Sequence, residues 1–486
     1  MIKLQQIINN KWFPYTFFCI AIGISVFQHY RIFSLDIIGV HVWRQTQTQT
    51  VIQNFAFEDF NILNPRLNDY GTPDRIYRME FPLNQWIIAG LYKFFGNHLI
   101  ITRLFFFITT LVSMIGIYKL IFELTGKKKT SMLSAWFFLF SPIIYYYSVN
   151  PMPDNLALCF SIWALFYWIK YLNFNVNIYF ILSCVFFALG FAIKLPFIVF
   201  GGMYLSKLIN LTSLREIKLK FFLIPFVISF PALVWYTSVI GTWHGNGVVK
   251  GIIGSQTSFL KLLDILQFNL ISTLPELLIN YATVPIFIIG FYFVLKKVDY
   301  KNKVHFSLLS IGILCIFYFL FEINMIDKIH DYYLFPFMPI LFIVIAFGLI
   351  EIQKMPFTKV KYLIIISFII SPITAYLRCN TRWNIYEPGF SNEYLFNKKK
   401  LREIILEDEK VIVYGDESKS IVLYVINRKG WCYPKNNISE KDFISDIKQG
   451  ALYLITDCNI DTNKIIQTHI LKTVYKKGNL QLYKLK

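Results

Sequence analysis

The sequence predicts a polytopic α-helical membrane protein that ends in a small α/β domain. Of its 486 residues, 56% are hydrophobic and only 16% are charged, and the mean hydropathy is +0.50. Apolar runs long enough to cross a bilayer recur as far as about residue 376. From about Arg378 the composition becomes that of an ordinary polar domain. The composition and the apolar runs exclude a soluble globular protein, and the polar C-terminal part indicates a separate domain.

The basic residues and the cysteines narrow the class further. The formal net charge is +19, but the Lys and Arg residues lie mostly in short clusters between apolar runs. This is the pattern of cytoplasmic loops, so it argues against nucleic-acid binding. None of the seven cysteines has the spacing of a metal site. Cys432 and Cys458 lie in the polar C-terminal part and could form a disulfide, but the sequence does not fix the distance between them.

Basic flanks set the orientation of the first spans. Lys3 and Lys11 precede the run 12–33, which has no cleavage site after it and is predicted to be a retained helix with a cytoplasmic start. Residues 34–97 then form a long outer loop. Two stretches of this loop have apolar and aromatic residues at helical spacing, which predicts short helices lying in the membrane interface; they are 42–57 and 82–95.

The later spans alternate in direction. They are predicted at about 98–122, 131–148, 156–172, 177–193, 197–209, 221–240, 281–295, 304–321, 334–350 and a last one ending near 376. Inner ends carry basic clusters, such as Lys127 to Lys129 and the loop around Arg215. The outer loop 241–280 contains Trp243, His244 and several glycines, which predicts a mobile loop. The total is about eleven helices. Such a chain would lie in a bacterial inner membrane with its C-terminus on the periplasmic side.

The C-terminal part shows α/β patterning, so we expect domains at 1–377 (transmembrane) and 378–486 (periplasmic). Buried strands are predicted at 410–414 and 451–455, further strands near 471–475 and 481–483, and helices at 400–406 and 442–447. Gly415, Asp416 and Glu417 follow the first strand. A strand-to-helix turn with an N-cap is favoured there over a binding turn.

Acidic and cationic residues gather at the predicted outer ends of the helices. They are accompanied by other polar and aromatic side chains, and the set is Asp36, His41, Arg44, Gln45, Arg78, Glu80, Asp154, Lys194, His330, Asp331, Tyr332 and Tyr333. Carboxylates beside cations at a lipid surface suit sugar transfer from a lipid-linked phosphate. A carboxylate takes the proton of the acceptor hydroxyl, and Lys and Arg offset the charge of the departing phosphate. Other acids could orient the sugar or hold a divalent cation, for which Asp36 and Asp154 are the candidate ligands.

The same residues carry a family resemblance over about residues 10–376. The motifs are Asp36 after the first helix, His41-Val42-Trp43-Arg44-Gln45, Glu80-Phe81-Pro82, Pro153-Asp154, the lone Lys194 before a proline, and His330-Asp331-Tyr332-Tyr333. In this order, and on one side of the membrane, they resemble the bacterial GT-C glycosyltransferases. The nearest branch is similar to lipid A aminoarabinose transferases and protein O-mannosyltransferases. A small outer α/β domain also fits this family.

The resemblance implies a role for each residue. Asp36 would be the catalytic base, Glu80 would lie near sugar and acceptor, and Asp154 would help form a substrate or metal site. Lys194, Arg44 and Arg78 would bind the lipid phosphate. His330 and Tyr332 of the late loop would bind the phosphate or the sugar. The chain departs from the aminoarabinose type at Phe81, where those relatives have a basic residue. Phosphate binding could then be shared with Arg78 or His330.

Several of these residues also have simpler structural explanations. Asp154 could be an N-cap, and Lys194 could extend to the membrane interface. His330 to Tyr333 could belong to an interfacial aromatic belt. For Arg78 the sequence favours neither a functional nor a structural role.

The expected function is inverting transfer of a sugar from a polyprenyl-phosphate donor to an acceptor hydroxyl outside the cytoplasm. The acceptor could be a glycolipid, a glycan or a protein. A glycolipid flippase is the first alternative, but it would need charged or helix-breaking residues within the membrane spans. An O-antigen-ligase-like transferase would carry its key Arg and His residues in a late loop. A catalytically inactive scaffold would tolerate the loss of Asp36.

Overall fold

The computed structural model describes two compact units. The described residues are 12–208, 218–243, 251–254, 257–356, 358–435, 437–460 and 463–486. Lys3, Lys11, Arg215 and His244, which entered the predictions, lie outside them. Unit 1 comprises 1–34, 79–81 and 103–380, and unit 2 comprises 35–78, 82–102 and 381–486.

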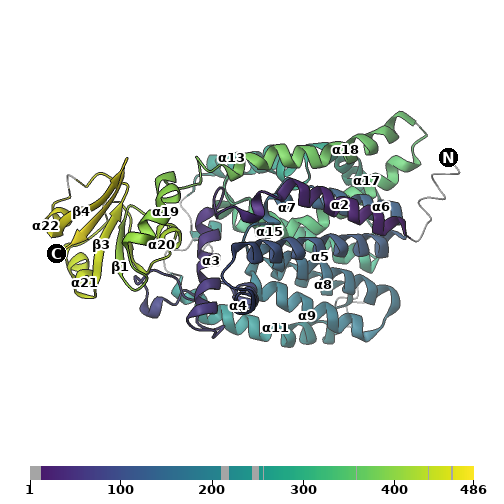
Figure 1. Cartoon of the computed structure of the whole chain (residues 1–486). Helices are drawn as coiled ribbons and strands as arrows, with labels where there is room; N and C mark the ends of the chain where they lie inside the picture. Colours follow the sequence, from purple (N-terminus) through teal and green to yellow (C-terminus); the bar gives the residue numbers. More distant parts are fainter. Residues whose placement is uncertain are drawn as a thin grey trace. The chain divides into compact units, whose positions relative to one another are not determined.

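Unit 1 is a helical bundle whose long helices run side by side (Figure 1). Its α-helices are α2 (Phe13–His29), α5 (Leu99–Thr125, beginning in unit 2), α6 (Lys128–Leu139), α7 (Pro142–Tyr147), α8 (Asp154–Phe174), α9 (Asn177–Ile193), α10 (Leu205–Leu208), α11 (Lys220–Val239), α13 (Phe259–Phe268), α14 (Val284–Lys297), α15 (Lys303–Phe321), α16 (Ile323–Ile326), α17 (Met338–Lys354) and α18 (Thr358–Asn380). The 3₁₀-helices of unit 1 are η1 (Ile32–Ser34), η3 (Leu195–Tyr204), η4 (Ile240–Thr242), η5 (Gly251–Gly254), η7 (Tyr281–Thr283) and η8 (Asp331–Phe337). A π-helix, η6, covers Asn269–Leu278.

The helices suit a membrane, but the predicted count of about eleven spans is not confirmed. Within the described residues, six helices are long and apolar enough to span a bilayer, or seven if a pair bent by 93° counts as one span. That pair is 259–278 with 281–297. Shorter apolar helices cover Phe13–His29, Asn177–Ile193 and Leu195–Leu208.

Three predicted features were wrong in detail. The span 131–148 is not one helix, because Ser141 is extended (ψ 127°) before Pro142 and separates α6 from α7. Proline lacks an N–H and disfavours helical backbone in the residue before it. The outer loop 241–280 is not all loop, since α13 and the π-helix η6 occupy 259–278. The span expected at 197–209 is mostly the 3₁₀-helix η3.

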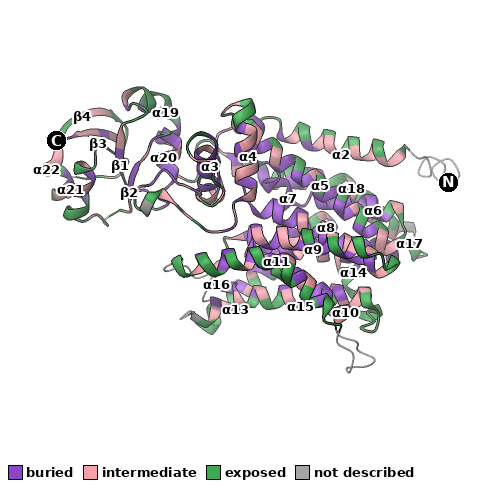
Figure 2. Ribbon diagram, turned by 90° about the horizontal axis from the view of Figure 1, so that it is seen from below, coloured by how far each residue is buried: buried purple, intermediate pink, exposed green. Residues whose placement is uncertain are grey.

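Burial separates inner from outer helices in unit 1. Within the apolar window of α8, 72% of the residues are buried, against 22% in α15, and Figure 2 shows the same contrast. Outer helices with exposed apolar side chains suit contact with lipid. Helices α14 and α17 approach closely because Gly290 and Gly348 face each other's backbones, where a Cβ at either position would collide with a carbonyl oxygen.

Unit 2 joins residues 35–78 and 82–102 to the C-terminal part of the chain. Its helices are α3 (Val42–Phe57), η2 (Pro73–Arg75), α4 (Leu83–Phe95), η9 (Thr381–Trp383), α19 (Asn392–Ile404), α20 (Ile421–Ile426), α21 (Glu440–Lys448) and α22 (Lys464–His469). Its strands are β1 (Lys410–Tyr414), β2 (Gly430–Tyr433), β3 (Ala451–Thr456), β4 (Ile470–Lys477) and β5 (Leu480–Leu485). Both predicted loop helices are present, and the predicted strands and helices of the C-terminal part are confirmed. Strand β2 and helices α20 and α22 were not predicted.

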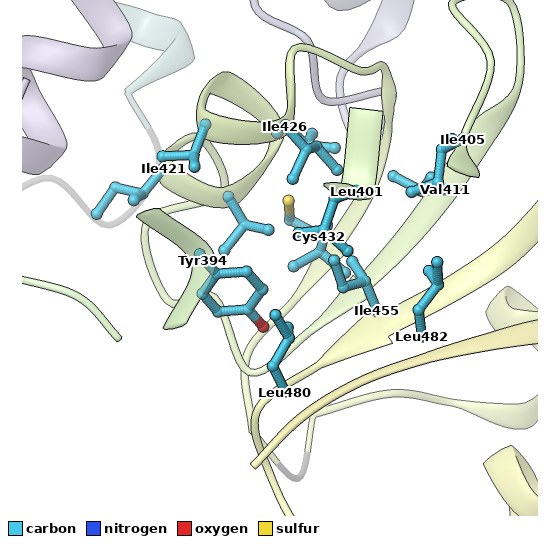
Figure 3. Close-up of a cluster of buried hydrophobic side chains, with 14 of the residues drawn as sticks. Tyr394, Leu401, Ile405, Val411, Ile421, Ile426, Cys432, Ile455, Leu480 and Leu482 are labelled. Atoms are coloured by element: carbon cyan, nitrogen blue, oxygen red, sulfur yellow. The ribbon is translucent and has the colours of Figure 1, made fainter. Parts of the chain in front are cut away.

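The five strands form one sheet in the order β2-β1-β3-β5-β4. Strand β1 is parallel to β2 and β3, and β5 is antiparallel to β3 and β4. Successive side chains of β1 point to opposite faces of the sheet. Val411 and Val413 therefore lie in one hydrophobic core, and Ile412 and Tyr414 lie in the other. Figure 3 shows the first core, which also receives Leu401 of α19.

The loop after α3 covers the free edge of the sheet. The N–H of Tyr70 donates to Gly430 O (2.8 Å), and the N–H of Gly430 donates to Asn68 O (3.1 Å). The N–H of Cys432 donates to Asp69 Oδ1 (3.1 Å). Glycine is required at Gly430, because a Cβ there would collide with Val411 O. Since β2 is an edge strand, these bonds satisfy groups that would otherwise be unpaired.

The turn after β1 is a capping turn, as the sequence favoured. Asp416 accepts from the N–H groups of Ser418 (2.8 Å) and Val422 (2.9 Å), and Ser418 Oγ accepts from the N–H of Ile421 (2.9 Å). These bonds satisfy the first turn of α20. Cys432 and Cys458 are both free thiols in this structure.

Candidate functional site

In unit 1 the candidate site begins with an ion pair between two neighbouring helix ends. Asn175 adopts the left-handed conformation (φ 54°) at the end of α8, so a short turn leads into α9 and the helices pack antiparallel. Gly190 permits close contact, because a Cβ there would lie 3.1 Å from Ala157 O. The first residue of α8 and the residue after α9 therefore meet. Lys194 Nζ lies 3.6 Å from Asp154 Oδ2, and both side chains are buried.

Two tyrosines contribute aromatic rings around Lys194. They come from η8, and Lys194 Nζ lies 5.6 Å from the ring centroid of Tyr332 and 5.4 Å from that of Tyr333. The two ring centroids are 4.8 Å apart. Cations within about 6 Å of an aromatic ring are attracted by its negative face. Lys194 is thus held by one carboxylate and two rings, in a place largely shielded from water.

The residues before Tyr332 shape this turn. Asp331 accepts a hydrogen bond from the Tyr147 hydroxyl (2.5 Å), which ties η8 to α7. His330 Nδ1 lies 2.6 Å from Met325 O, so this nitrogen donates to the backbone of the preceding turn. Both contacts fix where the tyrosines lie.

The residues on either side of Glu80 are anchored, and one of them bonds the same end of α9. The N–H of Phe81 donates to Ala192 O (3.2 Å), and Trp235 of α11 donates from Nε1 to Met79 O (3.0 Å). The rings of Phe81 and Trp235 pack edge to face at 5.3 Å. Glu80 is buried between these anchored neighbours. Phe81, the position where the resemblance expects a basic residue, therefore packs in this fold.

Arg103 is a residue that the sequence analysis missed. It is fully buried in α5 and donates from Nη1 to Val149 O (2.9 Å) and Asn150 Oδ1 (3.1 Å). It thereby holds the segment that leads to Asp154. A lone arginine in an apolar run was the available signal, since buried charges need partners. Its bonds to Val149 O and Asn150 Oδ1 give it a structural role.

The remaining predicted site residues belong to unit 2. Asp36 Oδ2 accepts from Lys398 Nζ of α19 at 2.5 Å, a partner that the sequence did not suggest. His41 begins α3 in the left-handed conformation (φ 58°), and Arg44 Nη1 donates to Gln47 Oε1 (3.2 Å).

Gln45 and Arg78 bind backbone oxygens of the same loop. Gln45 Nε2 donates to Val40 O (2.8 Å), and Arg78 Nε donates to Leu63 O (2.8 Å). The twelve predicted residues thus form two groups: Glu80, Asp154, Lys194 and the His330 to Tyr333 turn in unit 1, and Asp36, His41, Arg44, Gln45 and Arg78 in unit 2.

The described residues do not form a metal site. Across the part of the chain that the structure describes, no group of three or more His, Cys, Asp and Glu side chains is placed to hold a metal ion. Asp36 and Asp154, the two candidate ligands, belong to different units.

Comparisons with known proteins support the fold. Residues 80–235 match the family model for dolichyl-phosphate-mannose-protein mannosyltransferase. No curated protein sequence matches the chain. The structure of ArnT from Cupriavidus metallidurans, solved with undecaprenyl phosphate, superposes on this chain with a TM-score of 0.67 at 10% sequence identity. The superposition covers 97% of each chain.

Two larger enzymes share the architecture. The oligosaccharyltransferase AglB from Archaeoglobus fulgidus, solved with an inhibitory peptide and a dolichol-phosphate, has a TM-score of 0.56 at 13% identity, covering 93% of this chain and 70% of that one. The mycobacterial arabinofuranosyltransferase AftD has a TM-score of 0.56 at 12% identity, covering 98% and 40%. All are GT-C glycosyltransferases, so the predicted resemblance is confirmed and the chain has the GT-C fold.

Proposed function

We propose that the chain transfers a sugar from a polyprenyl-phosphate donor to an acceptor hydroxyl, on the extracytoplasmic side of a bacterial inner membrane. The observation that carries this proposal is Lys194, a buried cation held by Asp154 and by the rings of Tyr332 and Tyr333. A buried cation at a helix end suits a phosphate on a membrane-embedded lipid. ArnT and AglB, which share the fold, were solved with polyprenyl-type phosphates.

In this proposal the reaction is a single displacement. The Asp36 carboxylate takes the proton of the acceptor hydroxyl, and the acceptor oxygen forms the new bond to the anomeric carbon. The bond from that carbon to the phosphate oxygen breaks, and its electron pair leaves with the polyprenyl phosphate. Attack from the side opposite the leaving group inverts the anomeric configuration. Lys194 offsets the charge that develops on the phosphate.

Supporting roles follow from the two groups of residues. Glu80 and Asp154 would orient the sugar, and Asp154 also keeps Lys194 in place. Tyr332 and Tyr333 would offer apolar ring faces to the sugar, and Asp331 and His330 fix their turn. Arg44 and His41 would add donor contacts, while Gln45 and Arg78 hold the loop backbone that carries them. Residues 1–377 would form the membrane domain and 378–486 the outer domain.

The test is Asp36→Asn, which removes the base and keeps the shape. Asp36 is half-exposed, and exposed ion pairs contribute only about 0–1 kcal/mol, so the variant should fold normally. We expect transfer from a membrane extract supplying donor and acceptor to be lost, while binding of undecaprenyl phosphate, followed by native mass spectrometry, persists. Normal transfer by this variant would refute Asp36 as the base, and absence of lipid binding by the unmodified protein would refute the donor class.

A further inference from the structure

A small polar pocket lies within unit 2, next to Asp36. Its volume is about 220 Å³, and the first outer loop and the C-terminal part both line it. This is room for about seven waters at ~30 Å³ each, or for one sugar ring with its hydroxyls. Its polar lining includes Asp36, Gln49, Gln53, Asn97, Lys398 and Arg402.

Helix α19 contributes two different faces to this region. Tyr394 and Leu401 are buried in the core of the sheet, as Figure 3 shows. Lys398 and Arg402, one turn apart, line the pocket instead. Ile37 is buried in the same core and is only 1% exposed. Both sides of the pocket are therefore built on one packed core, which fixes Asp36 and Lys398 in place.

The chemistry of the lining suits a ligand rich in hydroxyls. Four side-chain amides, including that of Asn427, line the pocket together with a carboxylate and two cations, and amides offer both donors and acceptors. Gln53 Nε2 donates to Asn97 Oδ1 at 3.3 Å. Sugar hydroxyls likewise both donate and accept hydrogen bonds.

Gln49 gives independent support for a ligand. Its Nε2 donates to the Tyr92 hydroxyl (2.7 Å), while its Oε1 is buried and has no hydrogen-bond partner among the described residues. Gln49 as a whole is only 1% exposed. A buried acceptor without a partner is unfavourable by about 1–3 kcal/mol. A donor hydroxyl from a ligand in the adjoining pocket would remove this penalty.

Stability alone does not explain the ion pair in this pocket. The Asp36 and Lys398 side chains are 46% and 23% exposed, and pairs this open to solvent contribute about 0–1 kcal/mol. Arg402 donates from Nη2 to Val425 O (2.6 Å), so its guanidinium is also fixed. Two fixed cations beside a carboxylate thus form one polar wall of the pocket.

We infer that this pocket binds a saccharide, and that α19 of the C-terminal part contributes its cationic wall through Lys398 and Arg402. The saccharide is the acceptor, an assignment that rests on the proposed function. One of its hydroxyls donates to Asp36 beside Lys398, where the carboxylate is placed to take the proton. The C-terminal part thereby selects the acceptor.

The experiment measures saccharide binding to the full-length protein in detergent micelles by saturation-transfer NMR. The probes are the methyl glycosides of glucose, galactose, mannose and N-acetylglucosamine. At least one should give a signal that falls fivefold or more in Lys398→Met and recovers in part in Lys398→Arg. The matched control is Lys400→Met, which removes an exposed cation from the same helix that pairs with Glu403 away from the pocket. Its signal should equal that of the unmodified protein.

Undecaprenyl phosphate binding is measured on the same samples and separates the two proposals. We expect Lys398→Met to keep full lipid binding and an unchanged unfolding temperature. Intact lipid binding with no glycoside signal, or with a signal that Lys398→Met leaves unchanged, would overturn the saccharide pocket alone. Loss of lipid binding in the unmodified protein would overturn the proposed donor class, whereas a Lys398-dependent glycoside signal would still support the pocket.

Discussion

Replacing Lys194 by Met should destabilise unit 1 as well as abolish donor binding. The substitution keeps the length of the side chain but leaves the Asp154 carboxylate, which is 2% exposed, without the cation 3.6 Å away. At that separation and an effective dielectric constant of about 20, the lost attraction is about 5 kcal/mol. Removing one partner of a buried pair typically destabilises by about 3–5 kcal/mol. We therefore expect the unfolding temperature to fall by about 3–8 °C.

The double variant Lys194→Met with Asp154→Asn separates stability from function. It removes both charges, so the uncompensated carboxylate is absent and at least half of the lost stability should return. Donor binding should not return, because the cation proposed to hold the phosphate is still missing. Lys296→Met, which removes an exposed lysine at the end of α14, is the matched control and should change neither property.

Unfolding can be followed with a thiol-reactive dye, because Cys159, Cys184, Cys315 and Cys379 are all buried in unit 1. All variants are heated at one rate in one detergent, and undecaprenyl phosphate binding is read by native mass spectrometry. The reasoning would be refuted if Lys194→Met unfolded at the same temperature as Lys296→Met. It would also be refuted if the double variant were no more stable than Lys194→Met.

Three further predictions concern stability and positioning. Burial raises the pKa of Asp69 to about 6, above its usual 3.8, so the folded state loses stability as pH rises through 6. Lowering the pH from 7 to 5 should therefore raise the unfolding temperature less in Asp69→Asn than in the unmodified protein. An equal rise in both proteins would contradict this. Gly348→Ala should destabilise the contact of α14 with α17 by about 3 kcal/mol, whereas Gly312→Ala, where a Cβ meets nothing within 4 Å, should not; equal unfolding temperatures would contradict the packing argument. Trp235→Phe removes the bond to Met79 O that anchors the neighbourhood of Glu80, so transfer should fall more than lipid binding, and unchanged transfer would show that this anchor is dispensable.

The local regularities of the chain were predictable from sequence. Apolar composition indicated a helical bundle, and alternation at 410–414 and 451–455 indicated buried strands, because both patterns depend on neighbours a few residues apart. The order of the polar motifs also carried the resemblance to GT-C enzymes. The interruption at Ser141 was a local signal as well, since Pro142 was visible in the sequence.

Pairings between distant residues were decided by the tertiary structure. The sequence put Asp154 and Lys194 at the outer ends of neighbouring spans, and the packing of α8 on α9 makes them an ion pair. Asp36 and Lys398 are 362 positions apart, and no periodicity links them.

What the sequence by itself determined is the class of the protein and the residue types at its helix ends. Only the tertiary structure decided which of those residues share a site, because side-chain partners follow from how helices and sheet pack, and packing depends on contacts across the whole chain.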